Sequence, residues 1–221
     1  MSVQSRTRVV VLISGSGTNL QALINARQAG QLPIDLVAVI SNRPGVAGLQ
    51  RAEAAGIPAL TLDHKDFESR EAFDRALQEL IDRHHPDLVV LAGFMRILTP
   101  EFTRHYEGRM LNIHPSLLPR YQGLHTHERV LEAGDKEHGV TVHFVTDELD
   151  GGPPVVQARV PVHADDTAEA LARRVQAQEH TLYPLAVEWF AKGRLRMESG
   201  KAVLDNEPLG PSGRPMETSR R

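Results

Sequence analysis

The stretch TRVVVLISGSGTN, residues 7–19, begins with a nearly continuous run of β-branched residues and then turns on two glycines. Such a run is typical of a strand that is buried on both faces of a parallel sheet. Residues 19–30 follow as a predicted helix, which Gly30 ends because glycine favours the left-handed conformation. The sequence therefore predicts a strand, a sharp turn and a helix, the opening unit of a parallel α/β sheet.

The glycine turn is also a predicted anion site. The free N–H groups at a helix N-terminus and the helix dipole both point toward such a turn. Gly17, Thr18 and Asn19 place small or hydrogen-bonding groups where a phosphate would lie. A tight turn without a ligand is the alternative interpretation. Leu20 stands where dinucleotide-binding turns carry a third glycine, so no nicotinamide cofactor is expected.

The same alternation of strand and helix recurs along the first half of the chain. Further strands are predicted at 34–41, 58–62 and 87–91, and helices at 46–55 and 67–84. The inward face of the longer helix is formed by Phe73, Leu77, Leu80 and Ile81. These repeated units predict a Rossmann-like α/β fold, a mainly parallel twisted sheet with helices on both faces.

The second half of the chain predicts a different edge for this sheet. Residues 140–145 alternate in β fashion and residues 155–162 return, so the two segments form a hairpin and an antiparallel C-terminal edge. A long helix is expected over 165–192, and Pro184 should kink it or divide it in two. Residues 205–221 are rich in proline, glycine and charge, which predicts a mobile tail.

The segment MLNIHPSLLPRYQGL, residues 110–124, carries the candidate chemistry. Asn112 and His114 are two apart on an apolar run, so an extended strand presents both side chains on one face. Pro115 ends the ladder and favours a strand end that faces an open crevice. Asp150 follows in the acidic loop TDELDGG, residues 146–152. An amide, an imidazole and a carboxylate suit group transfer between two nitrogens through a tetrahedral oxyanion, whereas a polar strand end is the alternative.

Three other histidines are candidates for lesser roles. His125 and His127 lack a third ligand at a suitable spacing, and we expect them to cap a helix and line the substrate mouth rather than bind metal. His143 is expected to be a half-buried, hydrogen-bonded histidine that could stand near the active site. No metal site is predicted.

Three blocks closely resemble the folate-dependent formyltransferases: SGSGTN at 14–19, NIHPSLLP at 112–119 and ELDGG at 148–152. The resemblance extends over about residues 8–195. It implies the formyltransferase fold and transfer of a formyl group from 10-formyltetrahydrofolate to the primary amine of glycinamide ribonucleotide (GAR), in de novo purine biosynthesis. It also implies that folate is a cosubstrate and that no cofactor is tightly bound. Pro154 departs from the pattern, because the family has one proline here followed by an aliphatic residue.

The resemblance also implies residue roles. Asn112 would donate to the developing oxyanion, His114 would donate a second bond and supply a proton to N10 of the folate, and Asp150 would stabilise the imidazolium. The GAR-binding residues implied are Gly17, Thr18, Asn19, Pro115 and Glu179. The folate-binding residues implied are Arg70, Met95, Arg96, Ile97, Leu98, Asn112, Thr146, Asp147, Glu148, Leu149 and Asp150.

Composition limits the partners. A net charge of −3 argues against bulk binding to nucleic acid or to a membrane, and zero cysteines exclude disulfides and cysteine catalysis. We expect a cytoplasmic enzyme with small-molecule substrates, a monomer or weak homodimer, whose residues 1–204 form a single catalytic domain.

Three rival functions are considered. Formyltetrahydrofolate hydrolase has a similar Asn-His-Asp set but usually carries an N-terminal regulatory domain, for which residues 1–7 leave no room. Methionyl-tRNA formyltransferase adds a basic C-terminal RNA-binding domain, which the short tail and negative net charge disfavour. A non-catalytic nucleotide-binding module would bind GAR without formyl transfer.

Overall fold

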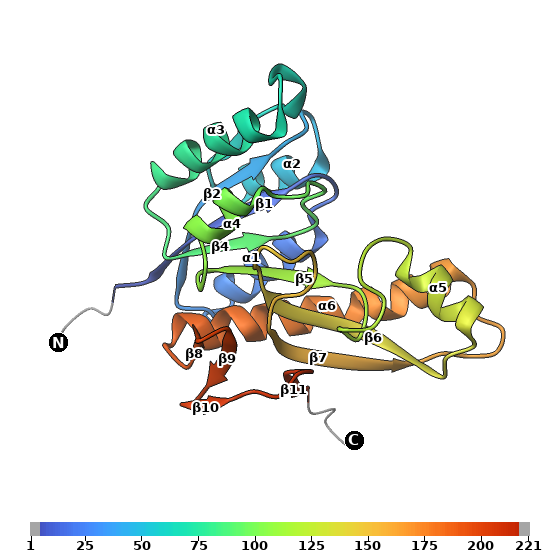
Figure 1. Cartoon of the computed structure of the whole chain (residues 1–221). Coiled ribbons are helices and arrows are strands. Elements are labelled where there is room, and N and C mark those ends of the chain that lie inside the picture. Colours follow the sequence, from blue (N-terminus) through green and yellow to red (C-terminus); the bar gives the residue numbers. More distant parts are fainter. Residues whose placement is uncertain (1–4, 217–221) are drawn as a thin grey trace.

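The computed structural model describes residues 5–216. A central eight-stranded sheet organises it, with the strand order β11-β7-β6-β5-β4-β1-β2-β3 (Figure 1). The strands of this sheet are β1 (Thr7–Ile13), β2 (Ile34–Ser41), β3 (Ala59–Thr61), β4 (Leu88–Leu91), β5 (Met110–His114), β6 (Glu137–Phe144), β7 (Pro154–Pro161) and β11 (Arg214–Pro215). The helices are α1 (Thr18–Gln28), α2 (Ala47–Ala54), α3 (Arg70–Asp82), α4 (Pro100–His105), α5 (Thr126–Ala133) and α6 (Ala168–Ala191), with a 3₁₀ turn at His64–Asp66.

The sheet confirms the predicted topology. Strands β1 to β5 pair in parallel, β6 pairs antiparallel to β5, and β7 pairs antiparallel to β6. The hairpin of β6 and β7 therefore forms the antiparallel edge, to which the short β11 adds a parallel pair.

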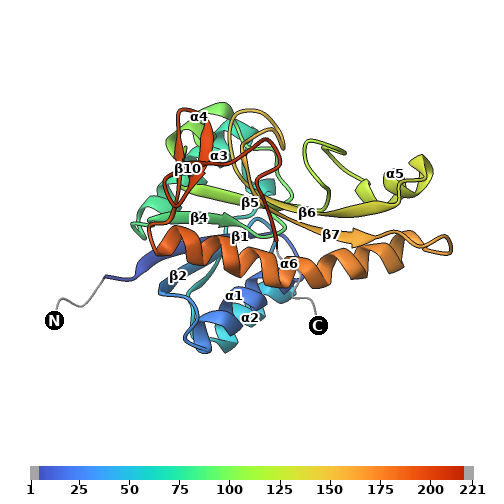
Figure 2. The ribbon, with the colours of Figure 1, turned by 90° about the horizontal axis from the view of Figure 1, so that it is seen from below.

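Helices cover both faces of the sheet, as Figure 2 shows from below. Strand β1 explains the two layers, because successive side chains point to opposite faces. Val9 and Val11 enter a core with α1, α2 and α6, whereas Val10 and Leu12 enter a second core with α3 and α4. Every residue of the run 9–13 is fully buried, which accounts for its unbroken apolar pattern.

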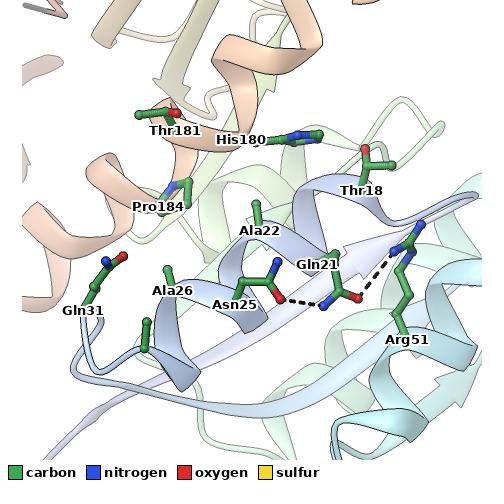
Figure 3. Close-up of a pocket in the computed structure, with 11 residues that line it drawn as sticks. Thr18, Gln21, Ala22, Asn25, Ala26, Gln31, Arg51, His180, Thr181 and Pro184 are labelled. Atoms are coloured by element: carbon green, nitrogen blue, oxygen red, sulfur yellow. Dashed lines mark hydrogen bonds between the residues drawn. The ribbon is translucent and has the colours of Figure 1, made fainter. Parts of the chain in front are cut away.

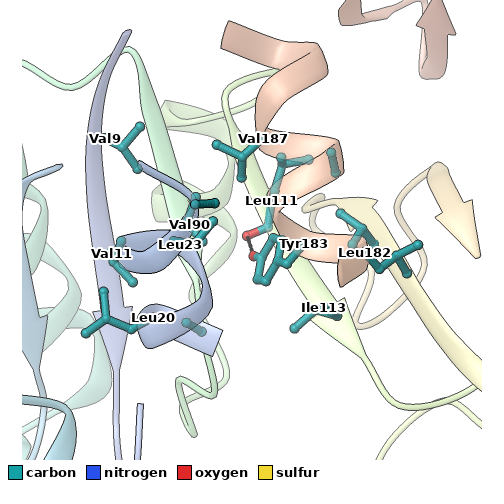
Figure 4. Packing of buried hydrophobic residues seen from close by; sticks show 14 of the residues in the cluster. Val9, Val11, Leu20, Leu23, Val90, Leu111, Ile113, Leu182, Tyr183 and Val187 are labelled. Carbon is teal, nitrogen blue, oxygen red and sulfur yellow. Dashed lines mark hydrogen bonds between the residues drawn. The ribbon is translucent and has the colours of Figure 1, made fainter. Parts of the chain in front are cut away.

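Helix α6 is fixed to the centre of the sheet by Tyr183, which is buried among Leu111, Ile113 and Leu182 (Figure 4). The Tyr183 hydroxyl lies 2.7 Å from the carbonyl oxygen of Leu91 and 3.0 Å from that of Leu111. The predicted division of this helix at Pro184 is wrong, because α6 is one continuous helix of 24 residues.

Other expectations need correction. Helix α3 starts at Arg70, not residue 67, because Ser69 accepts a hydrogen bond from the Ala72 N–H and caps it. Leu80 is only half-buried. The segment from residue 205 was expected to be a mobile tail, but its described part, to Met216, contributes β10 (Glu207–Pro208) and β11 to the two sheets. Residues 217–221 of that prediction lie outside the described residues.

Two features were not predicted. A small antiparallel sheet joins β8 (Leu195–Glu198), β9 (Lys201–Leu204) and β10, and α4 stands between β4 and β5. Within residues 5–216, no helix has both the length and the apolar character of a membrane span.

Candidate active site

Two hydrogen bonds each join a pair of loops near the carboxyl ends of β1, β4 and β5, and the acidic loop, which follows the antiparallel β6, reaches back to this edge. The Met95 N–H donates to Ser14 Oγ at 2.8 Å, which ties the loop after β4 to the glycine turn after β1. The Gly123 N–H donates to Asp150 Oδ2 at 2.9 Å, which ties the loop after β5 to the acidic loop between β6 and β7. Open α/β sheets bind their ligands at this edge.

Asn112 lies on β5 directly opposite His143 of β6. His143 Nδ1 is 2.9 Å from the Phe144 carbonyl oxygen, which can only accept, so Nδ1 carries the hydrogen. The pKa of His143 is lowered to about 4 by burial, so its ring is neutral at pH 7 and Nε2 holds a lone pair. The Asn112 amide nitrogen donates to that lone pair at 3.3 Å. This bond fixes the orientation of the amide, and within residues 5–216 its second N–H makes no hydrogen bond.

The sequence-predicted pair of His114 and Asp150 is brought together by the structure. His114 Nδ1 is 3.6 Å from Asp150 Oδ2, and the two side chains are only 8% and 9% exposed. His114 Nε2 donates to the Tyr121 carbonyl oxygen at 2.8 Å. Because 3.6 Å is too long for a hydrogen bond, Nδ1 is the ring nitrogen that remains available to reacting atoms.

The acidic loop is shaped by its backbone. Asp150 has a φ of 53°, in the left-handed region that favours glycine, asparagine and aspartate. A Cβ at Gly152 would stand 1.8 Å from the Phe144 carbonyl oxygen, so only glycine fits there. Pro154, the departure from the family pattern, begins β7 and comes two residues after the close approach at Gly152.

The predicted folate segment presents apolar side chains outward. Met95 and Ile97 are 61% and 57% exposed, unusual for large apolar residues, whereas Leu98 packs against the second core. The Arg96 guanidinium lies 4.8 Å above the Phe73 ring, so it turns away from solvent toward α3. Arg70 is exposed at the start of that helix.

The residues of the acidic loop differ in exposure and in the contacts that they make. Thr146 is half-buried, whereas Glu148 and Leu149 are exposed. Asp147 accepts hydrogen bonds from Thr103 Oγ1 and from Arg104 Nε, and these bonds, led by that of Thr103, lower the pKa of Asp147. The Asp147 carboxylate therefore anchors the loop to α4, and its backbone is what remains for a ligand.

The glycine turn meets α6 as well as α1. Gly17 is the N-cap of α1 with a φ of 72°, and Thr18 Oγ1 accepts from Gln176 Nε2 at 3.2 Å. Burial raises the pKa of Glu179, and the opposing effect comes from Asn19 of α1. The predicted GAR residues of α1 and α6 thus lie together. Pro115 directly follows β5.

Residues 7–187 match the formyl transferase family. The chain belongs to this family. It is 57% identical to phosphoribosylglycinamide formyltransferase of Escherichia coli K12 over 205 residues, which are 93% of this chain and 97% of that protein. The protein of the same name from Haemophilus influenzae is 48% identical, with the same coverage of both chains.

Solved structures of family members agree with the fold. Phosphoribosylglycinamide formyltransferase from Coxiella burnetii, determined in complex with CHES, has a TM-score of 0.92 at 53% identity and covers 96% of this chain and 100% of that one. A formyltetrahydrofolate deformylase from Pseudomonas putida has a TM-score of 0.80 at 30% identity, and the match covers 92% of this chain but 72% of that one. By identity, TM-score and coverage, the chain is therefore more similar to the phosphoribosylglycinamide formyltransferase from Coxiella burnetii than to the deformylase from Pseudomonas putida.

Sequence reasoning left several contacts of the site unassigned. Gln176, the Tyr121 carbonyl and the Gly123 N–H bind predicted site residues. His143 is fully buried rather than half-buried, and its place opposite Asn112 becomes visible only once β5 and β6 are set in register. The alternation of 140–145 indicates which side chains share a face of the strand, but it does not give the register with β5.

His125 and His127, at the start of α5, differ from expectation. His125 occupies the N-cap position of α5, but its side chain makes no capping hydrogen bond. His127 Nδ1 is 3.0 Å from His138 Nε2, so this ring pairs with a buried histidine of β6. Among the residues that the structure describes, no group of three or more His, Asp or Glu side chains is arranged to hold a metal ion.

Proposed function

We propose that the chain transfers the formyl group of 10-formyltetrahydrofolate to the primary amine of GAR, giving formyl-GAR and tetrahydrofolate. This is the phosphoribosylglycinamide formyltransferase reaction of de novo purine biosynthesis. The observation that carries the proposal is the 57% identity to the E. coli enzyme of that name over nearly the full length of both chains. The folate is a cosubstrate that leaves after each turnover, and no tightly bound cofactor takes part.

The reaction needs an oxyanion donor, which Asn112 supplies. The neutral amine of GAR attacks the formyl carbon, and the carbonyl oxygen becomes an oxyanion in the tetrahedral intermediate. His143 holds one N–H of the Asn112 amide, so the other N–H is oriented before the substrates arrive. A fixed donor aimed at developing charge costs no reorganisation in the transition state.

His114 and Asp150 carry out the proton transfers of the reaction. The attacking nitrogen loses a proton and N10 of the folate gains one as the carbon–nitrogen bond breaks, so the overall reaction releases no proton. His114 Nδ1 makes no hydrogen bond to a residue that the structure describes, and it faces Asp150 of the acidic loop. As an imidazolium it donates toward the oxyanion and then supplies the proton to N10. Asp150 balances that positive charge at 3.6 Å and accepts from the amine through water.

The substrates approach from two sides of this centre. The phosphate of GAR lies on the turn of Gly17, Thr18 and Asn19, with the ribose or amine near Glu179. The pterin lies against Met95 and Ile97, whose exposure supports an apolar slot for a flat heterocycle. Backbone groups of the segments 95–98 and 146–150 provide the polar contacts.

One incubation separates this function from hydrolysis. The protein is mixed with GAR and 10-formyltetrahydrofolate, and both formyl-GAR and formate are measured over time. Stoichiometric formyl-GAR with little formate is expected. Formate without formyl-GAR would assign the protein to the hydrolase reaction, and GAR binding without either product would assign a non-catalytic module.

A further inference from the structure

A cleft of about 580 Å³ is lined by residues of α1 and α6 and reaches Thr18, the residue after Gly17 of the glycine turn (Figure 3). Its floor is formed by small side chains of α1, and its rims carry three carboxamides, two hydroxyls and the imidazole of His180. Among the described residues that line it, there is no carboxylate, and Arg51 is the one that carries a permanent charge. The cleft is therefore an electropositive space that adjoins the predicted phosphate site.

Arg51 belongs to α2 and is held against the glycine turn. Its Nε donates to the Ser16 carbonyl oxygen at 2.7 Å, and its Nη1 donates to Gln21 Oε1 at 3.4 Å. Gln21 is held in turn by a bond from its Nε2 to Asn25 Oδ1 at 2.8 Å, and Figure 3 shows this chain of side chains along α1. The guanidinium thus has a fixed place at the Thr18 end of the cleft.

The packing of α2 explains why Arg51 reaches the turn. Gly48 lies one helical turn earlier on the same face, and its N–H donates to the Gly15 carbonyl oxygen at 3.0 Å. A Cβ at Gly17 would lie 2.6 Å from the Gly48 Cα and 3.4 Å from the Arg51 Cδ. The two backbones therefore touch, and the stem of Arg51 lies directly beside Gly17.

The guanidinium is not neutralised by the protein. No carboxylate within residues 5–216 lies within 4.0 Å of it, and its Nη2 makes no hydrogen bond to a described residue. By contrast, Arg104, Arg120, Arg174 and Arg194 each pair with an aspartate. Arginine is suited to phosphate because its planar fork offers parallel donors with a permanent charge.

We propose that Arg51 is a specificity-determining residue that reads the phosphate of the nucleotide substrate at the mouth of the α1–α6 cleft. This rests on the proposed function. The backbone N–H groups of the turn orient the phosphate, and Arg51 supplies the formal positive charge that the turn itself lacks. A nucleotide is therefore preferred over the corresponding nucleoside.

The substrate pair of GAR and its 5′-dephosphorylated riboside tests this assignment. For each of the parent, Arg51→Gln and Arg51→Lys, kcat/KM is measured for both acceptors at saturating 10-formyltetrahydrofolate. Arg27→Gln is the matched control, because Arg27 lies on α1 outside the cleft and loses the same charge. Inorganic phosphate serves as a competing probe against GAR.

Arg51→Gln should lower kcat/KM for GAR by at least about tenfold and leave the riboside almost unchanged, since hydrogen bonds to charged groups are the strong ones. Arg51→Lys should recover part of the loss, and inhibition by inorganic phosphate should weaken in Arg51→Gln alone. Equal losses for GAR and riboside would show that Arg51 only braces the turn and would overturn the proposal. If the parent does not formylate GAR at all, the proposed function fails first, which is a separate result.

Discussion

The Asn112 amide nitrogen lies 3.3 Å from the Nε2 of His143, directly across the ladder of β5 and β6. His143 is buried and neutral, so its lone pair accepts one N–H of the amide and selects one of the two possible amide orientations. In the proposed reaction, this hydrogen bond decides which group of the Asn112 amide faces the oxyanion. We therefore propose that His143 is a positioning residue for Asn112.

Replacing His143 by Ala should lower kcat while the KM values for GAR and folate change little. Loss of one buried hydrogen bond of this kind costs about 1–3 kcal/mol, which corresponds to about a 5- to 150-fold decrease in kcat. His143→Gln, which can still accept from Asn112, should recover part of the rate. Steady-state kinetics with both substrates varied provide the measurement, and a parallel rise in both KM values with kcat intact would contradict this role.

The pH dependence of stability should report the same buried ring. Burial lowers the pKa of His143 from 6.5 to about 4. Between these two pH values the ring is protonated in the unfolded chain but neutral in the folded chain. The stabilisation is present in full above pH 6.5 and is lost as the pH falls through about 4. His138, whose pKa burial also lowers to about 4, adds to the effect. The urea midpoint, followed from pH 7 to pH 4, should fall more steeply in the parent than in a folded His138→Gln variant.

Gly17 tests how tightly the turn is packed. Gly17→Ala places a Cβ 2.6 Å from the Gly48 Cα and also forces a positive φ on alanine. Gly30→Ala is the matched control, since Gly30 has a φ of 76° but no atom near its Cβ position. Both variants should lose about 1 kcal/mol from the positive φ, and Gly17→Ala should lose about 1–3 kcal/mol more from overpacking. Thermal unfolding of both variants provides the measurement. Equal stability of Gly17→Ala and Gly30→Ala would contradict the close contact at Gly17.

The sequence was sufficient where a physical signal was local. Long β-branched runs predicted β1, β2 and β4, and the alternation of 140–145 predicted the hairpin of β6 and β7. The strands β8 to β10 escaped notice because each is short and carries charged residues, so none of them forms an apolar run like that of β4. Helix α4 has six residues, too few to show a helical repeat of apolar positions. Thr99 at its N-cap and Pro100 at its first residue are nevertheless typical of a helix start.

In the candidate site, too, the sequence predicted the residues that stand in local motifs and missed the contacts that depend on tertiary packing. Asn112, His114 and Asp150 stand in sequence motifs, and the structure brings all three to one strand end. The contacts of Tyr121, Gly123 and Gln176 depend on loop closure and on the packing of α6, which no local pattern encodes. The orientation of Asp147 toward α4 likewise depends on a neighbour that the sequence did not reveal.

Arg70 is predicted to contact the glutamate carboxylate of the folate. It is exposed at the first residue of α3, so solvent screens its charge. Arg70→Ala should weaken folate binding less than about fivefold at low salt and leave GAR binding unchanged. Added salt should reproduce part of the loss in the parent. Arg75→Ala, on an exposed face of the same helix, is the control, and equal folate affinity of parent and Arg70→Ala would remove this contact.

Asp150 is predicted to act on the chemical step through His114. Asp150→Asn should preserve the loop, because an amide oxygen can still accept from the Gly123 N–H, but it removes the charge that faces His114 Nδ1 at 3.6 Å. Loss of positioned proton transfer should lower kcat by about 10²–10⁴, with little change in the KM of either substrate. His114→Ala should cost a similar factor, and the double variant little more, because residues that act as a unit are not additive. Asp166→Asn removes a carboxylate that pairs with Arg174 at 2.7 Å, away from the strand end, and is expected to keep the parent kcat. Additive losses in the double variant would instead mean that Asp150 and His114 serve separate steps, with Asp150 acting on water or on the folate alone.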